Sequence, residues 1–321
     1  MKRCPPRKSD SDRRCGKGTP ANTDLRDSTR RTWWFRLALA IGAPALFLLA
    51  LEGGLRLSGC GYPTTFFLSR EINGRAMWVD NWQFGWRFFP RAIARMPNPL
   101  SLPRQKAPGT MRIFILGESA ALGVPAPEYG FSRMLQVLLS EQFPDRKFEV
   151  ANVSMVAVNS HAIVPIAREC ARRNGDLWII YMGNNEVIGP FGAHGVIGSK
   201  TPPLALIRAN LALKTTRTGQ LFDAALQRLR TRRAWTQWQG MQMWGERVGR
   251  DDPRISLVHT NFQKNLAAIL AAGREAKVPM ILGTVACNLR DCSPFGSRRG
   301  SGLAPAQQTA WERDFQAGMA R

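Results

Sequence analysis

Two short polar segments, 117–119 and 183–186, hold residues that could do chemistry, and each directly follows an apolar run. Ser119 ends the first segment. A serine on a tight turn after a strand can expose its hydroxyl as a nucleophile, and nearby backbone N–H groups can stabilise a developing oxyanion. Asn185 lies in the second segment, where its carboxamide could donate a hydrogen bond to the same oxyanion. These residue types together suit attack of a hydroxyl on an acyl carbonyl.

A third segment of small and polar residues, 152–160, follows another apolar run. Each of the three segments also has a purely structural explanation, because serine commonly caps helices and asparagine is common in turns. Only a shared position in the fold would make them one site.

The runs before these segments predict the strands that position them, because short apolar runs bounded by turn residues are typical of buried parallel strands. We expect strands at 112–116, 148–153, 177–182 and 279–285. Apolar residues at helical spacing predict helices at 130–143, 161–173, about 204–244 and about 261–276, the second with Ser160 as its N-cap.

Strands that alternate with helices predict an α/β domain with a mainly parallel sheet flanked by helices. Ligands of such sheets bind at the carboxyl ends of the strands. We therefore expect the three polar segments to meet at one edge of the sheet.

The order and spacing of the three segments resemble the GDSL/SGNH hydrolases, over roughly Arg112 to Val285. The resemblance implies a three-layer, flavodoxin-like fold. Segment 117–119 is similar to the family's Gly-Asp-Ser block, with Glu118 in place of Asp, which implies that Ser119 is the nucleophile.

Segment 183–186 is similar to the family's Gly-x-Asn-Asp block, with Glu186 in place of Asp, which implies that Asn185 is an oxyanion donor. The family's second block supplies a glycine N–H to the same oxyanion hole. The matching position here is Ala157 or, as the alternative, Ser154. Alanine keeps the backbone donor, provided that the backbone angles do not require glycine.

A narrower resemblance is carried by an apolar segment near the N-terminus and by the stretches 84–90 and 181–186. These are similar to bacterial membrane-anchored SGNH proteins that continue into a tetratricopeptide-like helical region. The amphipathic segment 304–321 would be the start of such an extension, which could contact protein partners.

The family's catalytic base is a histidine in a late Asp-x-x-His block, and a serine hydroxyl is a poor nucleophile without a base. The chain has three histidines, His161, His194 and His259, and none has an acidic residue three positions before it. We therefore expect the chain to be a truncated gene product, with little activity by itself.

The net charge of +22 is far from neutral, yet the sequence holds no recognisable nucleic-acid-binding module. We therefore expect no nucleic-acid partner; anionic lipid or glycan remains possible, as does an arginine-rich solvated surface. The six cysteines form no CxxC pair and no Cys/His cluster, so we expect neither a metal site nor a cofactor.

Residues 33–52 are apolar apart from Arg36 and Glu52, begin with a tryptophan pair and follow a basic tail. They predict a single transmembrane signal anchor with the N-terminus in the cytoplasm and the main domain on the other side of the membrane. The resemblance implies that this membrane is the inner membrane of a bacterial cell. The alternative is lipoprotein processing, because 57–60 resembles a lipobox that would make Cys60 a lipidation site.

The predicted domain organisation follows from these segments. It consists of a disordered basic tail at 1–32, the anchor at 33–52, an aromatic and proline-rich lead-in of short strands and turns at 53–110, an incomplete SGNH-like α/β domain at 111–303 and a helical extension at 304–321.

The resemblance implies an exported hydrolase of acyl esters, whose substrate could be an acylated glycan or lipid. An acyl transferase of the same fold is an alternative. A second alternative is a non-catalytic envelope protein that binds anionic glycan or assembles with partners, which the positive charge and the substituted family blocks favour.

Overall fold

Four parallel strands form the sheet that the apolar runs predict. Their order across the sheet is β5-β4-β6-β7, so the chain's first strand of this sheet lies inside it. The strands are β4 (Thr110–Gly117), β5 (Lys147–Asn152), β6 (Leu177–Tyr181) and β7 (Met280–Gly283). The predicted fold class, a parallel sheet flanked by helices, is confirmed.

The computed structural model describes residues 23–194, 201–229, 248–249, 251–288, 290 and 302–319. The chain divides into two compact units, 1–59 and 60–321. The sheet belongs to the second unit.

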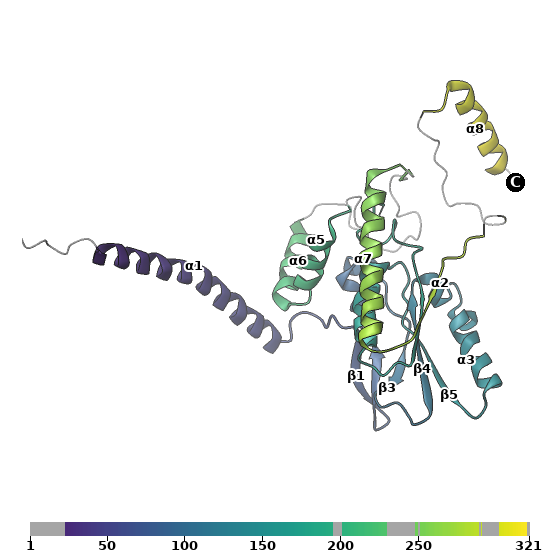
Figure 1. Cartoon of the computed structure of the whole chain (residues 1–321), viewed down its shortest axis with the longest axis horizontal. Coiled ribbons are helices and arrows are strands. Elements are labelled where there is room, and N and C mark those ends of the chain that lie inside the picture. Colours follow the sequence, from purple (N-terminus) through teal and green to yellow (C-terminus); the bar gives the residue numbers. More distant parts are fainter. Residues whose placement is uncertain are drawn as a thin grey trace, which may run out of the picture. The chain divides into compact units, whose positions relative to one another are not determined.

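Helices cover both faces of the sheet (Figure 1). The chain passes from β4 outward to β5 and then back across β4 to β6, so right-handed crossovers place the two connections on opposite faces. One connection holds α2 (Ser119–Leu122), η3 (Pro127–Tyr129) and α3 (Phe131–Gln142); the other holds α4 (Ser160–Cys170). Helix α4 packs against α7 (Pro253–Glu275).

The helical region expected from about 204 divides into α5 (Leu204–Leu213) and α6 (Arg217–Leu229). The end of the predicted region, 230–244, lies outside the described residues. Ser160 was predicted to cap α4, but the N-cap is Asn159 and Ser160 is the first helical residue. Helix α8 (Pro305–Met319) occupies most of the predicted extension at 304–321.

Helix α3 meets the sheet with a polar side chain. The Gln136 amide donates to Phe148 O at 3.1 Å and accepts from Val150 N at 2.9 Å, so it satisfies backbone groups on the outer side of edge strand β5. Met134 and Leu138, part of the helix's apolar stripe, are exposed.

Residues 53–57, predicted as part of the lead-in, are the end of α1 (Thr23–Leu57), whereas from Cys60 onward the lead-in segment belongs to the same unit as the sheet and shares its core. It forms an antiparallel sheet of β1 (Phe67–Ile72), β2 (Arg75–Asp80) and β3 (Ser101–Pro103), with short helices η1 (Phe84–Arg87) and η2 (Arg91–Ile93). Phe66, Phe84 and Phe88 are buried among residues of the main sheet and its helices. The predicted short strands and turns are present.

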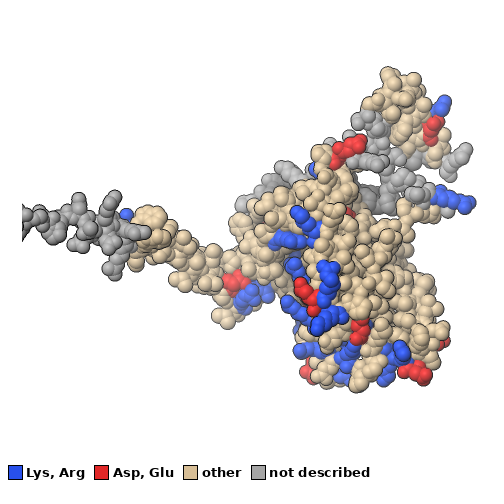
Figure 2. All heavy atoms as spheres, in the orientation of Figure 1, with Lys and Arg blue, Asp and Glu red and all other residues tan. Residues whose placement is uncertain are grey.

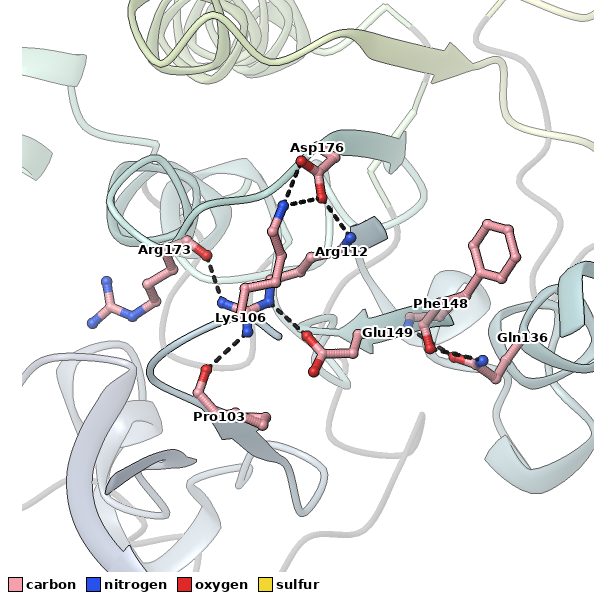
Figure 3. A network of polar contacts seen from close by, with 9 residues as sticks. Pro103, Lys106, Arg112, Gln136, Phe148, Glu149, Arg173 and Asp176 are labelled. Carbon is pink, nitrogen blue, oxygen red and sulfur yellow. Dashed lines mark hydrogen bonds and ion pairs between the residues drawn. The ribbon is translucent and has the colours of Figure 1, made fainter. Parts of the chain in front are cut away.

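A buried arginine joins the lead-in to the sheet (Figure 3). The Arg112 guanidinium on β4 is fully buried and donates to Glu149 on β5, to Arg173 O after α4 and to Pro103 O on β3, each at 2.8 Å. Asp176 accepts from the Arg112 backbone N–H at 2.6 Å and pairs with Lys106.

A second junction lies at the start of the lead-in. The Glu169 carboxylate accepts the backbone N–H groups of Phe66 and Phe67 at 2.7 and 3.1 Å. The Arg173 guanidinium lies 4.3 Å from the Phe67 ring centroid and 4.4 Å from that of Trp78. Helix α4 and the turn after it therefore hold the lead-in by charge-assisted hydrogen bonds and cation–π contacts.

The first unit contains α1 (Thr23–Leu57), which begins ten residues before the predicted anchor. Its stretch Thr32–Leu57 is the one helix among the described residues that is long and apolar enough to cross a membrane. At 1.5 Å per residue its 26 residues extend about 39 Å, more than the roughly 30 Å of a hydrocarbon core.

Candidate active site

The nucleophile candidate lies where β4 ends. Ser119 is the first residue of the short helix α2, and its carbonyl accepts from Gly123 N and Val124 N at 3.0 and 3.1 Å. Gly117 precedes this turn, and a Cβ there would lie 2.0 Å from Tyr181 O on β6. Only glycine lets β4 and β6 approach this closely, so Gly117 sets the turn that presents Ser119.

Glu118 connects the Ser119 turn with the end of β6. Its side chain is fully buried, and its carboxyl oxygens accept from Gly183 N at 3.3 Å and from Asn185 N at 2.9 Å. The carboxyl group is therefore a brace between the two segments. In the sequence, Glu118 stands out only as a replacement for the family's aspartate, and no local pattern predicts this role.

Asn185 connects the end of β6 with the segment after β5. Its carboxamide is buried, and Nδ2 donates one hydrogen bond to Val158 O at 2.9 Å. This bond fixes the orientation of the carboxamide. Nδ2 carries a second hydrogen, which can be donated to a ligand.

Two hydrogen bonds thus connect the segments that hold the three predicted residues. Ser119 adjoins Glu118, Glu118 holds Asn185, and Asn185 holds Val158, which adjoins Ala157. In the described part of the chain, the backbone N–H groups of Ser119 and Ala157 and the Ser119 hydroxyl have no protein hydrogen-bond partner. They remain available to a ligand.

Ala157 has a left-handed backbone, with φ of 61°. A non-glycine residue there costs about 1 kcal/mol, so this is a position at which glycine would be less strained. Ser154, the alternative for the same role, is buried, and its hydroxyl lies 3.4 Å from Ile115 O. The Ser154 backbone N–H, which the alternative role would use, donates to Asn152 Oδ1 at 3.1 Å.

The site's two carboxyl groups have raised pKa values. Burial, followed by the neighbouring Glu186, raises the pKa of Glu118 to about 8, although backbone N–H groups oppose the shift. Burial also raises the pKa of Glu186 to about 7 against its hydrogen bonds from Ser160. Both groups therefore change charge near neutral pH.

Glu186 begins a buried polar network behind the site. It accepts from the Ser160 backbone N–H and hydroxyl, both at 2.8 Å. Asn265 on α7 lies 3.0 Å from the Ser160 hydroxyl and 3.0 Å from His161 Nδ1. This network fixes the first turn of α4, and with it the segment that holds Ala157.

None of the histidines has a described contact with Ser119. His161 faces Asn265, and burial followed by Arg208 lowers its pKa to about 4. His259 is exposed on α7. His194 follows the turn at Phe191, and its backbone N–H donates to Val187 O at 2.9 Å.

Within the described ranges, no group of three His, Cys, Asp or Glu side chains could hold a metal ion. Cys170 is buried, and Cys60 and Cys287 are exposed thiols.

No protein-family model matches the chain, and neither does any curated protein. Solved structures that it resembles include TesA, with 14% identity over 53% of this chain and 77% of that chain and a TM-score of 0.26. The acetyl xylan esterase AlAXEase shows 13% identity over 54% of this chain and 77% of that chain, with a TM-score of 0.27. AlinE4, an SGNH-hydrolase family esterase, shows 10% identity over 67% of this chain and 97% of that chain, with a TM-score of 0.26. At these identities and TM-scores the matches assign neither a family nor an activity.

Proposed function

We propose that the chain carries an SGNH-type acyl-transfer site in which Ser119 attacks the carbonyl carbon of an ester. The observation that carries the proposal is the chain of hydrogen bonds from Glu118 through Asn185 to Val158. These bonds join segments that hold a hydroxyl, two backbone N–H groups and an oriented carboxamide, and each segment follows the carboxyl end of a strand, which supports the proposal. The strand order reverses direction between β4 and β6, which is where α/β sheets bind ligands.

The three donors would act on the oxygen of the tetrahedral intermediate. When Ser119 Oγ bonds to the carbonyl carbon, that oxygen becomes an oxyanion, and the N–H groups of Ser119 and Ala157 and Nδ2 of Asn185 stabilise it. Donors that are already oriented need no reorganisation when the charge develops, and one such donor contributes a factor of about 10²–10³ in rate. Collapse of the intermediate then expels the alcohol and leaves an acyl-serine.

The reaction also needs a group that takes the proton from Ser119. His161 does not fit this role. Its Nδ1 contacts Asn265, and its ring is buried on α4. An ester with a good leaving group depends least on proton transfer to a base. Acylation by such an ester is therefore the step at which Ser119 is best tested.

The substrate class follows from the proposed location. If α1 anchors the chain with its N-terminus in the cytoplasm of a bacterial cell, the second unit lies outside the inner membrane. An acylated glycan or lipid of the envelope would then be within reach. Water as acceptor makes the protein a hydrolase, and a sugar hydroxyl makes it a transferase.

The test is covalent labelling of the full chain with p-nitrophenyl acetate, followed by mass spectrometry of its peptides. We expect an acetyl group on the peptide that contains Ser119 and none after Ser119→Ala. Asn185→Ala should slow labelling by about 10²-fold, because one oxyanion donor is lost.

Ser140→Ala is the matched control, because this hydroxyl lies on α3 and bonds to Gln136 O at 2.8 Å. It should label at the normal rate. An acetyl group found on other residues, or a rate unchanged by Asn185→Ala, would contradict the proposal.

A further inference from the structure

Helix α5 is apolar on two opposite faces. Leu204, Ile207 and Leu211 are buried, the last two in the core of the second unit. Leu206 and Leu213 lie seven residues apart, hence on one stripe, and both are exposed. A surface helix of a soluble domain normally turns a polar face outward. A helix with apolar residues on its outer face as well can bury them against a membrane or another protein.

The next helix also exposes apolar side chains. On α6 the side chains of Leu221 and Phe222 are 52% and 62% exposed, and Ala225 lies on the same stripe. The exposed leucines and phenylalanine of α5 and α6, here called the hairpin surface, are Leu206, Leu213, Leu221 and Phe222.

Helices α5 and α6 are here called the hairpin. Helix α6 is hydrogen-bonded to Tyr62, near the start of the second unit. Gln220 is buried, and its side chain accepts from Tyr62 N at 2.9 Å and donates to Tyr62 O at 3.1 Å. A Cβ on Gly61 would lie 2.4 Å from Gln220 Oε1, so the chain passes close against α6. Helix α1 ends at Leu57, five residues before Tyr62. Five residues extend at most about 18 Å.

This short connection limits the position of the hairpin. If α1 spans a bilayer, Tyr62 stays within about 18 Å of the helix end, and Gln220 of α6 is hydrogen-bonded to it. The hairpin also carries positive charge: segment 204–229 has Arg208, Lys214, Arg217 and Arg228 against a single acidic residue, Asp223. Figure 2 shows Lys and Arg outnumbering Asp and Glu on the viewed face of this unit.

We propose that the hairpin surface lies in the headgroup region of the membrane that α1 spans, with its leucines and phenylalanine in contact with acyl chains. The inference rests on the membrane anchoring proposed above. Apolar side chains supply the burial, and the three arginines attract anionic headgroups, whereas Lys214 pairs with Asp223 at 3.3 Å. Two contacts, α1 and the hairpin, then restrict how the second unit is oriented on the bilayer.

Photocrosslinking of the full chain tests this placement. The chain is reconstituted in vesicles of phosphatidylcholine and phosphatidylglycerol with a benzophenone side chain at one position, as in Phe222→p-benzoylphenylalanine. Illumination should give a lipid adduct at position 222, about tenfold above that at position 72. Ile72 is an exposed apolar residue at the end of β1 and serves as the control. In vesicles of phosphatidylcholine alone the adduct at 222 should decrease.

A benzophenone at Leu46, exposed on α1, separates failure of this inference from failure of the anchor. A lipid adduct at 46 without one at 222 overturns the inference and leaves the anchor standing. Adducts at neither position overturn both. A crosslink from 222 to the tryptophan-containing segment 230–247, or to a second copy of the chain, in place of lipid also overturns it.

Discussion

Glu118 shows how one buried side chain can hold a site together. Its carboxyl group accepts backbone N–H groups from the end of β6, which keeps the turn at Ser119 beside Asn185. Burial nevertheless disfavours the charged form, and Glu186 adds repulsion. The same group that braces the site is therefore expected to make the fold sensitive to pH near neutrality.

The sign of this effect follows from the raised pKa values. The pKa of Glu118 is about 8 and that of Glu186 about 7 in the folded chain, against 4.5 for an unperturbed carboxyl. Their contribution to stability is complete below pH 4.5 and is lost as the pH rises through 7–8. His161, with its pKa lowered to about 4, acts oppositely, but only between about pH 4 and 6.5.

We therefore expect the free energy of unfolding to fall between pH 6.5 and 8.5, by on the order of 1 kcal/mol per pH unit. Near-ultraviolet circular dichroism during thermal unfolding in detergent would measure it. Glu118→Gln should flatten the dependence, whereas Glu141→Gln, at an exposed position on α3, should not. An unchanged slope in Glu118→Gln would contradict the role assigned to Glu118.

At the scale of elements, Arg112 joins three strands to the turn that follows α4. Its guanidinium bonds reach β3, β5 and Arg173 O, and its backbone belongs to β4 (Figure 3). Lys106, by contrast, pairs with Asp176 while both side chains are partly exposed. The two ion pairs in one network should therefore differ in their effect on stability, since solvent screens only the second.

Arg112→Met should destabilise the second unit by about 3–5 kcal/mol, because it leaves Glu149 and two carbonyl oxygens without a donor. Lys106→Met should cost no more than about 1 kcal/mol. Urea unfolding followed by circular dichroism compares the two variants. Equal losses would show that Arg112 does not hold the lead-in to the sheet.

At the scale of the whole chain, the proposed arrangement depends on α1. The wild-type chain should stay with membranes through an alkaline carbonate wash. Leu46→Arg combined with Leu49→Arg should release it, because each arginine near the centre of a spanning helix costs about 2.5–3.5 kcal/mol. Leu57→Arg, at the exposed end of the helix, is the control and should remain membrane-bound. Release of the wild-type chain, or retention of the double variant, would refute the anchor.

The sequence determined the features that depend on neighbouring residues. Apolar runs located the strands of the main sheet within a few residues, and their alternation with helices predicted the parallel sheet and the edge at which Ser119 and Asn185 lie. These predictions succeed because strand burial and crossover direction follow from local pattern and chain chirality.

Only the tertiary structure decided what depends on distant partners. Glu118 meets Asn185 across 67 positions, and Arg112 meets Arg173 across 61. No local pattern records such contacts. The sequence likewise did not predict the left-handed backbone of Ala157 or the polar contact of Gln136 with edge strand β5. A residue's type and spacing limit what it can bind, but the packed fold decides which partner occupies the other end of the bond.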